Sequence, residues 1–173
     1  MPKGKRVVVD ASVARSAGSG EKANEFSLPS RAVLDAVADH HWIAFSQEGL
    51  DEWRRHRRQF SGRWLQLMIG KKRVLFLGDT KNDHLRSRLG AACALVSEKR
   101  AILKDAHLVE AACQTDRIVI SRDETVRDLF RRACHQVQEI HDVCWANPEI
   151  EDERVADWLI SGARSEVARK LGS

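Results

Sequence analysis

Two apolar segments of this chain each lead into an aspartate. Residues 7–9 (Val-Val-Val) run into Asp10, and residues 118–122 (Ile-Val-Ile-Ser-Arg) run into Asp123. Runs of β-branched residues are typical of buried parallel strands, whose carboxyl ends form the ligand-binding edge of an open α/β sheet. Carboxylates gathered there repel one another unless a cation holds them, and hard divalent cations prefer oxygen ligands. The pattern therefore predicts a site for a divalent metal ion.

Two further carboxylates stand beside expected helices. Asp105 begins a helical pattern over residues 104–114, and Glu52 lies in a helix that follows an apolar strand. An aspartate at the start of a helix is, taken alone, more often a cap than a ligand. Glu48 precedes Glu52 by one helical turn on the same face, so these two glutamates compete for one position.

Strands alternate with helices along the chain. The expected strands cover residues 6–10, 42–45, 73–77, 117–120 and 137–141. A short helical turn and a loop are expected over 11–27, and the main helices over 31–40 (capped by Ser30), 46–58 and onward to about 69, 80–100 in two pieces, 104–114, 124–134 and 149–171. This alternation predicts βα units and an α/β fold, a three-layer α/β/α sandwich around a central, mostly parallel sheet.

Composition narrows the class of protein. The 173 residues suffice for one domain with a proper core, and 43% apolar and 31% charged residues are typical of a globular protein. The net charge of +4 is a mild bias that is compatible with a polyanionic partner. No secretory signal, no bilayer-spanning run and no CxxC pair is visible, which predicts a reduced, cytoplasmic protein without membrane association.

Three segments, in this order, resemble PIN-domain nucleases. The first is an apolar strand that ends in Asp-x-Ser, at residues 10–12. The second, residues 45–53 (Phe-Ser-Gln-Glu-Gly-Leu-Asp-Glu-Trp), joins a strand to a serine cap and a glutamate. The third and most specific combines an Asp-led, Ala-rich helix at residues 104–112 with a strand and Ser-x-Asp at residues 118–123. The resemblance covers residues 6–148, and its ordered segments favour a shared site for the acids over isolated helix caps.

The resemblance implies a PIN-like nuclease domain over residues 1–148, with residues 149–173 as a C-terminal helical extension of the same domain. It implies a metal-dependent endoribonuclease that hydrolyses RNA phosphodiester bonds with Mg²⁺ or Mn²⁺. Carried over residue by residue, the family's catalytic and metal-binding acids are Asp10, Glu52, Asp105 and Asp123. The supporting residues are Ser121, Ser12 and Glu48.

Basic residues near these segments are candidates for contacts with RNA. Arg122 lies between Ser121 and Asp123, and Arg54, Arg55 and Arg58 fall in the helical run 53–58. Arginine pairs well with phosphate, although such a run is equally typical of a solvated helix face. The histidines His40, His41, His84 and His107 lack a zinc-ligand spacing, which favours surface or capping roles.

Several functions remain open at this point. A toxin of a toxin–antitoxin pair, held by an antitoxin protein, and an RNA-processing nuclease both fit the resemblance. A catalytically inactive PIN-like module that binds RNA or protein is the alternative from another class. A phosphatase is disfavoured because Ser12 stands where that chemistry needs a second aspartate. A homodimer is a further expectation, with the tail from Glu149 as a candidate interface.

Overall fold

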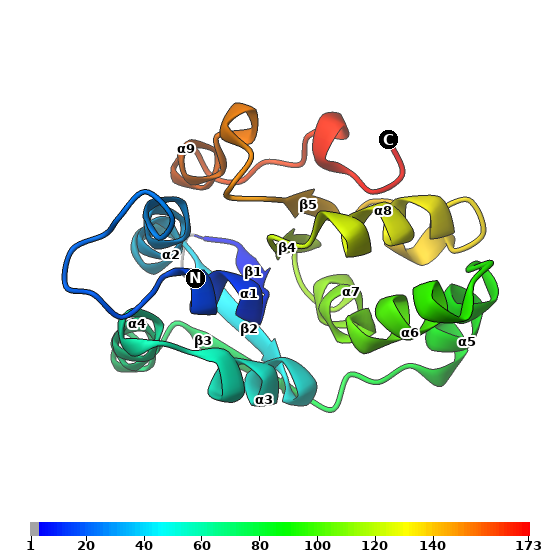
Figure 1. The fold of residues 1–173 in the computed structure, drawn as a ribbon, viewed down its shortest axis with the longest axis horizontal. Helices are drawn as coiled ribbons and strands as arrows, with labels where there is room; N and C mark the ends of the chain where they lie inside the picture. Colours follow the sequence, from blue (N-terminus) through cyan, green and yellow to red (C-terminus); the bar gives the residue numbers. More distant parts are fainter. Residues whose placement is uncertain (1–3) are drawn as a thin grey trace.

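A central sheet of five parallel strands organises the protein, which a computed structural model describes over residues 4–173 (Figure 1). The strands lie side by side in the order β3-β2-β1-β4-β5. Their bounds are β1 Arg6–Val9, β2 Trp42–Ser46, β3 Val74–Gly78, β4 Ile118–Ile120 and β5 Cys144–Ala146.

Helices cover both faces of the sheet, and two apolar clusters fill the space between them. The first cluster joins one sheet face to α1 (Ala11–Ser16), α2 (Leu28–His40), α3 (Gln47–His56), α4 (Gln59–Gly70) and α9 (Val155–Ile160). The second joins the other face to α5 (Asp83–Ala91), α6 (Val96–Lys104), α7 (Ala106–Cys113) and α8 (Glu124–Ala133). The fold is therefore the expected α/β/α sandwich, with the two helix layers on either side of the sheet in Figure 1.

The strand order reverses direction between β1 and β4. The chain leaves β1 toward β2 and β3, and later returns to place β4 on the opposite side of β1. Val8 is in register with Val119 and Val9 with Ile120, so both strands end at the same level. A reversal of this kind opens a crevice at the carboxyl ends of the strands, where ligands bind in open α/β sheets. Asp10 comes directly after β1 at this point.

The last strand lies later in the chain than expected. Residues 137–141 were predicted as a strand, but Gln138–Ile140 form a 3₁₀ turn (η1) and the strand is β5. Val137 and Ile140 are both fully buried in the second apolar cluster. Residues three apart point to one side in a 3₁₀ turn and to opposite sides in a strand, so this burial requires the turn.

Two helix predictions also need correction. Ser30 does not cap a helix, because α2 already begins at Leu28 and Ser30 is buried within it. The expected helix over 149–171 is reduced to α9 and two 3₁₀ turns, η2 (Glu151–Glu153) and η3 (Val167–Arg169). Gly162, with φ of 104°, lies outside the helical region, so α9 cannot continue through it. Within residues 4–173, no helix combines the length and apolarity needed to cross a bilayer.

His41 joins three parts of the fold at the amino ends of the strands. Its Nδ1 accepts a hydrogen bond from the Lys5 amide at 3.0 Å, and its Nε2 therefore donates to the Leu159 carbonyl at 2.7 Å. The residue is 1% exposed, which contradicts a surface role, but it is the C-cap of α2, in agreement with the expected alternative of a capping role. Burial lowers the pKa of His41, and the neighbouring His40 and Lys5 lower it further, so the ring is neutral in the fold.

We expect the neutral His41 ring to make folding stability sensitive to acid. Its pKa in the fold lies below that in the unfolded chain, so the unfolded state gains the proton first as pH falls below about 6.5, and stability declines. His41→Gln keeps a donor and an acceptor but cannot be protonated, and should lose less stability between pH 7 and pH 5 in urea unfolding. His135→Gln, at an exposed histidine beyond the end of α8, should keep the wild-type slope. Equal slopes in all three proteins would contradict this assignment.

Candidate active site

A small pocket of about 140 Å³ lies at the carboxyl ends of β1 and β4. It brings together all four predicted acids, which come from four separate parts of the chain. Its lining consists of Asp10, Ala11, Ser12, Arg15, Glu52, His56, Lys104, Asp105 and Asp123. The juxtaposition of these acids follows from the reversal of strand order, because no two of them belong to the same helix or strand.

Asp10 is held by two hydroxyl groups. Ser12 Oγ donates to Asp10 Oδ2 at 2.6 Å, and Ser121 Oγ donates to the same oxygen at 2.8 Å. Hydrogen bonds to a carboxylate favour its charged form and fix its orientation. Asp10 Oδ1 accepts no hydrogen bond from residues 4–173, so it remains available to a ligand.

Ser121 connects the two strand-end acids. Its Oγ accepts a hydrogen bond from the Asp123 amide at 3.1 Å while it donates to Asp10. Asp123 itself caps α8, since its Oδ1 accepts from the Val126 amide at 2.9 Å. This capping role and a role in the pocket are compatible, because a carboxylate has a second oxygen and several lone pairs.

Glu52 reaches the pocket because α3 is fastened to β1. The adjacent Trp53 is 1% exposed and donates from Nε1 to the Val9 carbonyl at 2.7 Å, one residue before Asp10. At the start of α3, Ser46 caps the helix as expected by accepting from the Gly49 amide at 3.0 Å. Glu52 pairs with Arg55 at 2.6 Å and lies 3.4 Å from Nε2 of His56, one turn further along the helix.

Asp105 carries the clearest electrostatic signature. It lies between α6 and α7, and its pKa is raised from 3.8 to about 7. Burial is the largest cause, and the charges of Asp10, Asp123 and Glu52 add to it, while Lys104 acts in the opposite direction. A carboxyl group loses its charge when other carboxylates crowd it in a dehydrated place. The shift therefore reports that the four acids share one electrostatic environment.

Glu48 serves a different part of the structure. Its carboxylate accepts from Arg86 Nη2 at 2.7 Å, and Arg86 makes two further bonds to the buried Glu110 of α7 at 2.8 and 2.7 Å. These partners raise the pKa of Arg86 above its ordinary value. The ion pairs link α3, α5 and α7 beside the pocket. Of the two competing glutamates, only Glu52 lines the pocket.

His107 is a buried residue rather than a surface or capping one. It is 4% exposed in α7, and its Nδ1 has no hydrogen-bond partner within residues 4–173. Burial lowers its pKa, so the ring is neutral despite the nearby acids. A Cβ atom at Gly49 would lie 3.6 Å from His107 Nδ1 and 3.2 Å from Ser46 Oγ. Glycine at that position leaves room for the Ser46 cap of α3, while the distance to His107 is an ordinary van der Waals contact.

The basic residues at the pocket differ from those predicted. Arg54 and Arg55 lie on the exposed side of α3 beside Asp51 and Glu52, and Arg58 is exposed at the start of α4. The basic side chains that line the pocket are Arg15, Lys104 and His56. Sequence spacing could have identified them, since Arg15 follows Ser12 by three residues, His56 follows Glu52 by four, and Lys104 precedes Asp105.

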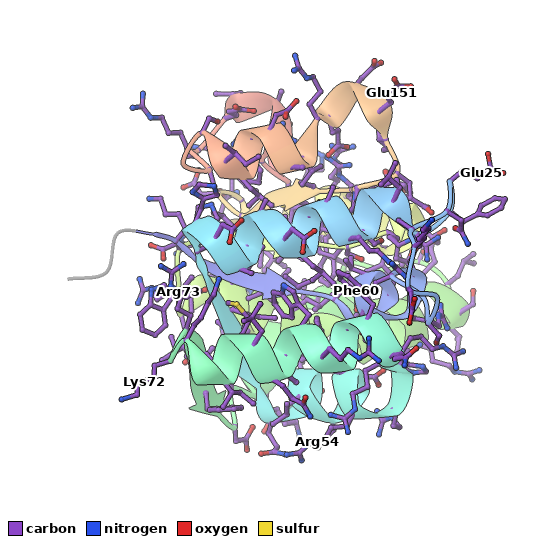
Figure 2. All side chains as sticks on the ribbon, turned by 90° about the vertical axis from the view of Figure 1, so that its left-hand side faces the viewer. Glu25, Arg54, Phe60, Lys72, Arg73 and Glu151 are labelled. Atoms are coloured by element: carbon purple, nitrogen blue, oxygen red, sulfur yellow. The ribbon has the colours of Figure 1, made fainter. Side chains whose placement is uncertain are left out.

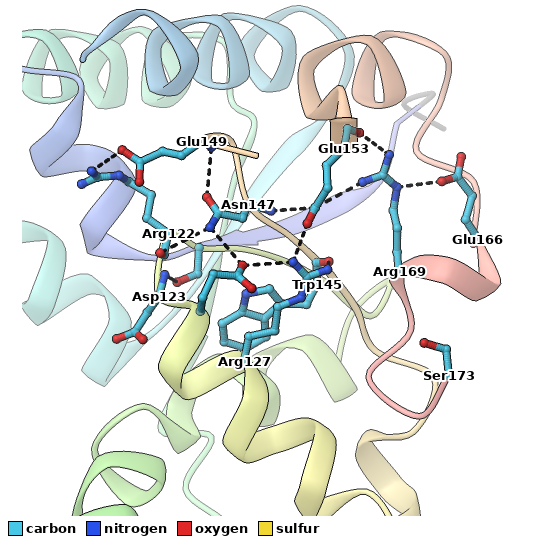
Figure 3. Close-up of polar contacts among 12 residues, drawn as sticks. Arg122, Asp123, Arg127, Trp145, Asn147, Glu149, Glu153, Glu166, Arg169 and Ser173 are labelled. Atoms are coloured by element: carbon cyan, nitrogen blue, oxygen red, sulfur yellow. Dashed lines mark hydrogen bonds and ion pairs between the residues drawn. The ribbon is translucent and has the colours of Figure 1, made fainter. Parts of the chain in front are cut away.

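Arg122 is turned toward the C-terminal tail. Its guanidinium pairs with Glu149, and its amide donates to Ser12 Oγ at 3.2 Å. Asn147 donates to Glu124 at 2.9 Å and accepts from the Glu149 amide at 3.0 Å. Figure 3 shows these contacts, with the Asp123 carboxylate directed away from them.

A larger hollow of about 580 Å³ lies at the opposite ends of the strands. Its two carboxylates are already paired, Asp116 with Arg6 at 2.9 Å and Asp39 with Lys71 at 3.5 Å. It therefore lacks the crowding of four acids that distinguishes the smaller pocket.

The donor set of the small pocket suits Mg²⁺ or Mn²⁺ in kind, because both ions prefer carboxylates and water. Among residues 4–173, however, no three His, Cys, Asp or Glu side chains form a group placed to hold a metal ion. Mg²⁺ commonly keeps several waters and takes one or two carboxylates directly. An ion here would accordingly reach the other acids through water. Asp10, with one free oxygen, is the first candidate for a direct ligand.

Comparison of the chain with protein-family models, with curated proteins and with solved structures gave no match. The chemistry of the site therefore has to be argued from its own residues.

Replacing Asp105 with asparagine should stabilise the protein at alkaline pH. A pKa raised to about 7 means that the folded state keeps a proton that the unfolded state releases above pH 3.8, so stability falls between those values. The shift corresponds to at most about 4 kcal/mol, and solvent screening reduces it, so we expect Asp105→Asn to gain about 1–3 kcal/mol at pH 8 and less at pH 5. Urea unfolding at both pH values measures this, with the exposed Asp152→Asn as control. A gain independent of pH would contradict the shared environment.

Proposed function

We propose that this protein is a metal-dependent ribonuclease of the PIN-like type that cleaves RNA internally. The observation that carries the proposal is the convergence of four carboxylates on one pocket at the reversal of the sheet. Phosphodiester hydrolysis needs an activated water and relief of the charge on phosphate, and a bound Mg²⁺ or Mn²⁺ supplies both.

Asp10 and Asp123 are proposed as the main holders of the ion. Asp10 is oriented by Ser12 and Ser121 and offers a free oxygen, and Asp123 is oriented as the cap of α8. Asp105 is proposed to complete the set. Burial first and the neighbouring negative charges second raise its pKa to about 7, so positive charge in the pocket would favour its charged form near neutral pH.

Glu52 is proposed to orient the attacking water. It has a partner in Arg55 and a neighbour in His56, both on α3, so it is held at the rim of the pocket. Arg15 and Lys104 line the same pocket and supply positive charge for a phosphate group. An RNA substrate is consistent with the net charge of +4. The proposal includes the toxin of a toxin–antitoxin pair acting in the cytoplasm, with an antitoxin that covers the pocket.

A second candidate is a PIN-like module that binds RNA or protein without turnover. It is favoured by one observation, which is that no three metal-binding side chains within residues 4–173 form a group placed to hold an ion. The two candidates differ in whether a divalent ion binds at the acids, so metal binding and cleavage together decide between them.

Asp10→Asn and Asp123→Asn should each lower cleavage of a mixed RNA pool in Mg²⁺ or Mn²⁺ by at least about 100-fold. Asparagine is as good a helix cap as aspartate, so Asp123→Asn removes the charge and keeps the start of α8. Thermal unfolding checks that both variants fold. Wild type with EDTA gives the metal-free baseline, and Asp152→Asn should cleave like wild type. Cleavage by the Asp10 variant at the wild-type rate would refute the proposed site.

Mn²⁺ alone should stabilise the wild-type protein at pH 7.5. A ligand at a hundred times its dissociation constant adds about 2.7 kcal/mol, which for a chain of this size corresponds to a rise in melting temperature of about 5–10 °C. Asp10→Asn should lose most of this shift, and Asp152→Asn should retain it. A wild-type protein that shows no shift at any Mn²⁺ concentration would favour the binding module over the nuclease.

A further inference from the structure

The carboxyl end of β5 lies beside that of β4 but supplies no residue to the lining of the acidic pocket. Asn147 follows β5 directly, as Asp10 follows β1, and it is 3% exposed. The Ser121 amide donates to the Ala146 carbonyl at 3.0 Å, so the turn that carries Asp123 leaves β4 against this end of β5. Burying a polar side chain costs free energy unless its donors and acceptors are used, so the partners of Asn147 show what it holds in place.

Asn147 contacts the chain on both sides of Asp123. Its Nδ2 donates to the Glu124 carboxylate at 2.9 Å and to the Arg122 carbonyl at 3.4 Å. These acceptors belong to the residues immediately after and before Asp123. One side chain beyond β5 therefore bridges the turn that presents Asp123 to the pocket, as Figure 3 shows.

The surroundings of Asn147 require an amide side chain. Its Nδ2 faces two acceptors, whereas its Oδ1 accepts from the Glu149 amide at 3.0 Å. An aspartate would set a second carboxylate against Glu124, and a hydroxyl or apolar side chain would leave at least one of these partners unsatisfied. The bond to Glu149 also closes a turn around Pro148, whose ring fixes its φ.

A buried ion pair holds Asn147 itself. The Asn147 backbone amide donates to Glu153 Oε2 at 2.9 Å, and the other carboxylate oxygen of Glu153 accepts from Arg127 Nη1. Arg127 is 3% exposed and also donates from Nη2 to the Trp145 carbonyl at 2.9 Å. The Glu153 side chain is 15% exposed, whereas Glu151 in the same 3₁₀ turn is exposed and lies at the margin of the molecule in Figure 2. The end of β5 is therefore a fixed support for the turn beside it.

We propose that Asn147 is a positioning residue of the acidic site, which keeps Asp123 close enough to Asp10 for both to hold one cation. This inference rests on the proposed function and adds a residue that does not line the pocket. Ser121 bonds to the Asp123 amide from the side of β1, and Asn147 bonds to the flanking residues from the side of β5. Residues that orient a metal ligand in this way typically change metal affinity by about 10- to 100-fold when they are replaced.

Amide hydrogen exchange tests the positioning in the absence of metal. Asn147→Asp removes both donors and places a carboxylate beside that of Glu124, so the turn should open more often. The amides of Asp123 and Val126, which are bonded within this turn, should exchange at least about 10-fold faster relative to the amides of β1 and β2. Asn82→Ala removes the side-chain cap of α5 and serves as the matched control, in which this ratio should stay unchanged.

Titration with Mn²⁺ in a calorimeter tests the consequence for the site. Asn147→Asp should bind Mn²⁺ about 10- to 100-fold more weakly than wild type, and Asn82→Ala should bind it like wild type. Glu124→Gln should also bind like wild type, because its carbonyl oxygen still accepts from Asn147. Combining Glu124→Gln with Asn147→Asp restores the bond with donor and acceptor exchanged, so the double variant should recover most of the lost affinity. A general loss of stability would not be rescued in this way.

The results separate the positioning role from the proposed function. Unchanged exchange in Asn147→Asp, wild-type affinity for Mn²⁺ in that variant, or an affinity that the double variant does not recover would overturn the positioning role. A wild-type protein that binds no Mn²⁺ would overturn the nuclease, while the exchange rates still decide whether Asn147 holds the turn. Thermal unfolding verifies that each variant folds, and Asn147→Ser replaces Asn147→Asp in both measurements if that variant does not.

Discussion

Repulsion among four carboxylates is the constraint around which this end of the molecule is organised. Asp10, Glu52, Asp105 and Asp123 share a partly dehydrated pocket, and burial first and the neighbouring acids second raise the pKa of Asp105, which is an electrostatic cost to the fold. Apolar packing offsets that cost, since β1 and β4 are buried on both faces between two helix layers. At acidic pH, the protonated, neutral form of Asp105 has the lower free energy in the pocket. A bound cation would favour the charged form instead.

Short hydrogen-bonded connections hold the acids against this repulsion. Ser121 bonds to Asp10 and to the amide of Asp123, so it ties the ends of two neighbouring strands together. Trp53 bonds to the carbonyl of Val9 and brings α3 to the same edge. The Ser121–Asp10 and Trp53–Val9 bonds join residues that are distant in the chain. The strand register brings the ends of β1 and β4 to the same level, which makes the first of these bonds possible. The positions of Asp10, Asp123 and Glu52 therefore follow from the sheet and from the helix bonded to it rather than from flexible loops.

Much of the fold and of the acidic set could be predicted from the sequence, for identifiable reasons. Residues 7–9 of β1 and the whole of β4 are runs of Val and Ile, and Ser46 and Asp123 are caps whose side chains bond as their residue types suggest. The prediction failed at β5, because Cys144-Trp145-Ala146 is a strand through burial rather than through β-branched residues. It also missed Arg15 and Lys104 at the pocket. Helical spacing places Arg15 near Ser12, but whether such a residue faces the pocket also depends on how separate helices dock, which local spacing alone does not determine.

The C-terminal tail beyond β5 affects both the edges of the sheet and the surroundings of the acidic pocket. Along the sheet it covers the β5 edge, which leaves β3 as the open edge within residues 4–173. Beside the pocket, Glu149 pairs with Arg122, and Asn147 bonds to that tail and to Glu124 at the start of α8 (Figure 3). An arginine next to Asp123 would otherwise compete for its carboxylate and neutralise the pocket. Because Glu149 draws that guanidinium away, Arg122 does not offset the negative charge of the acids.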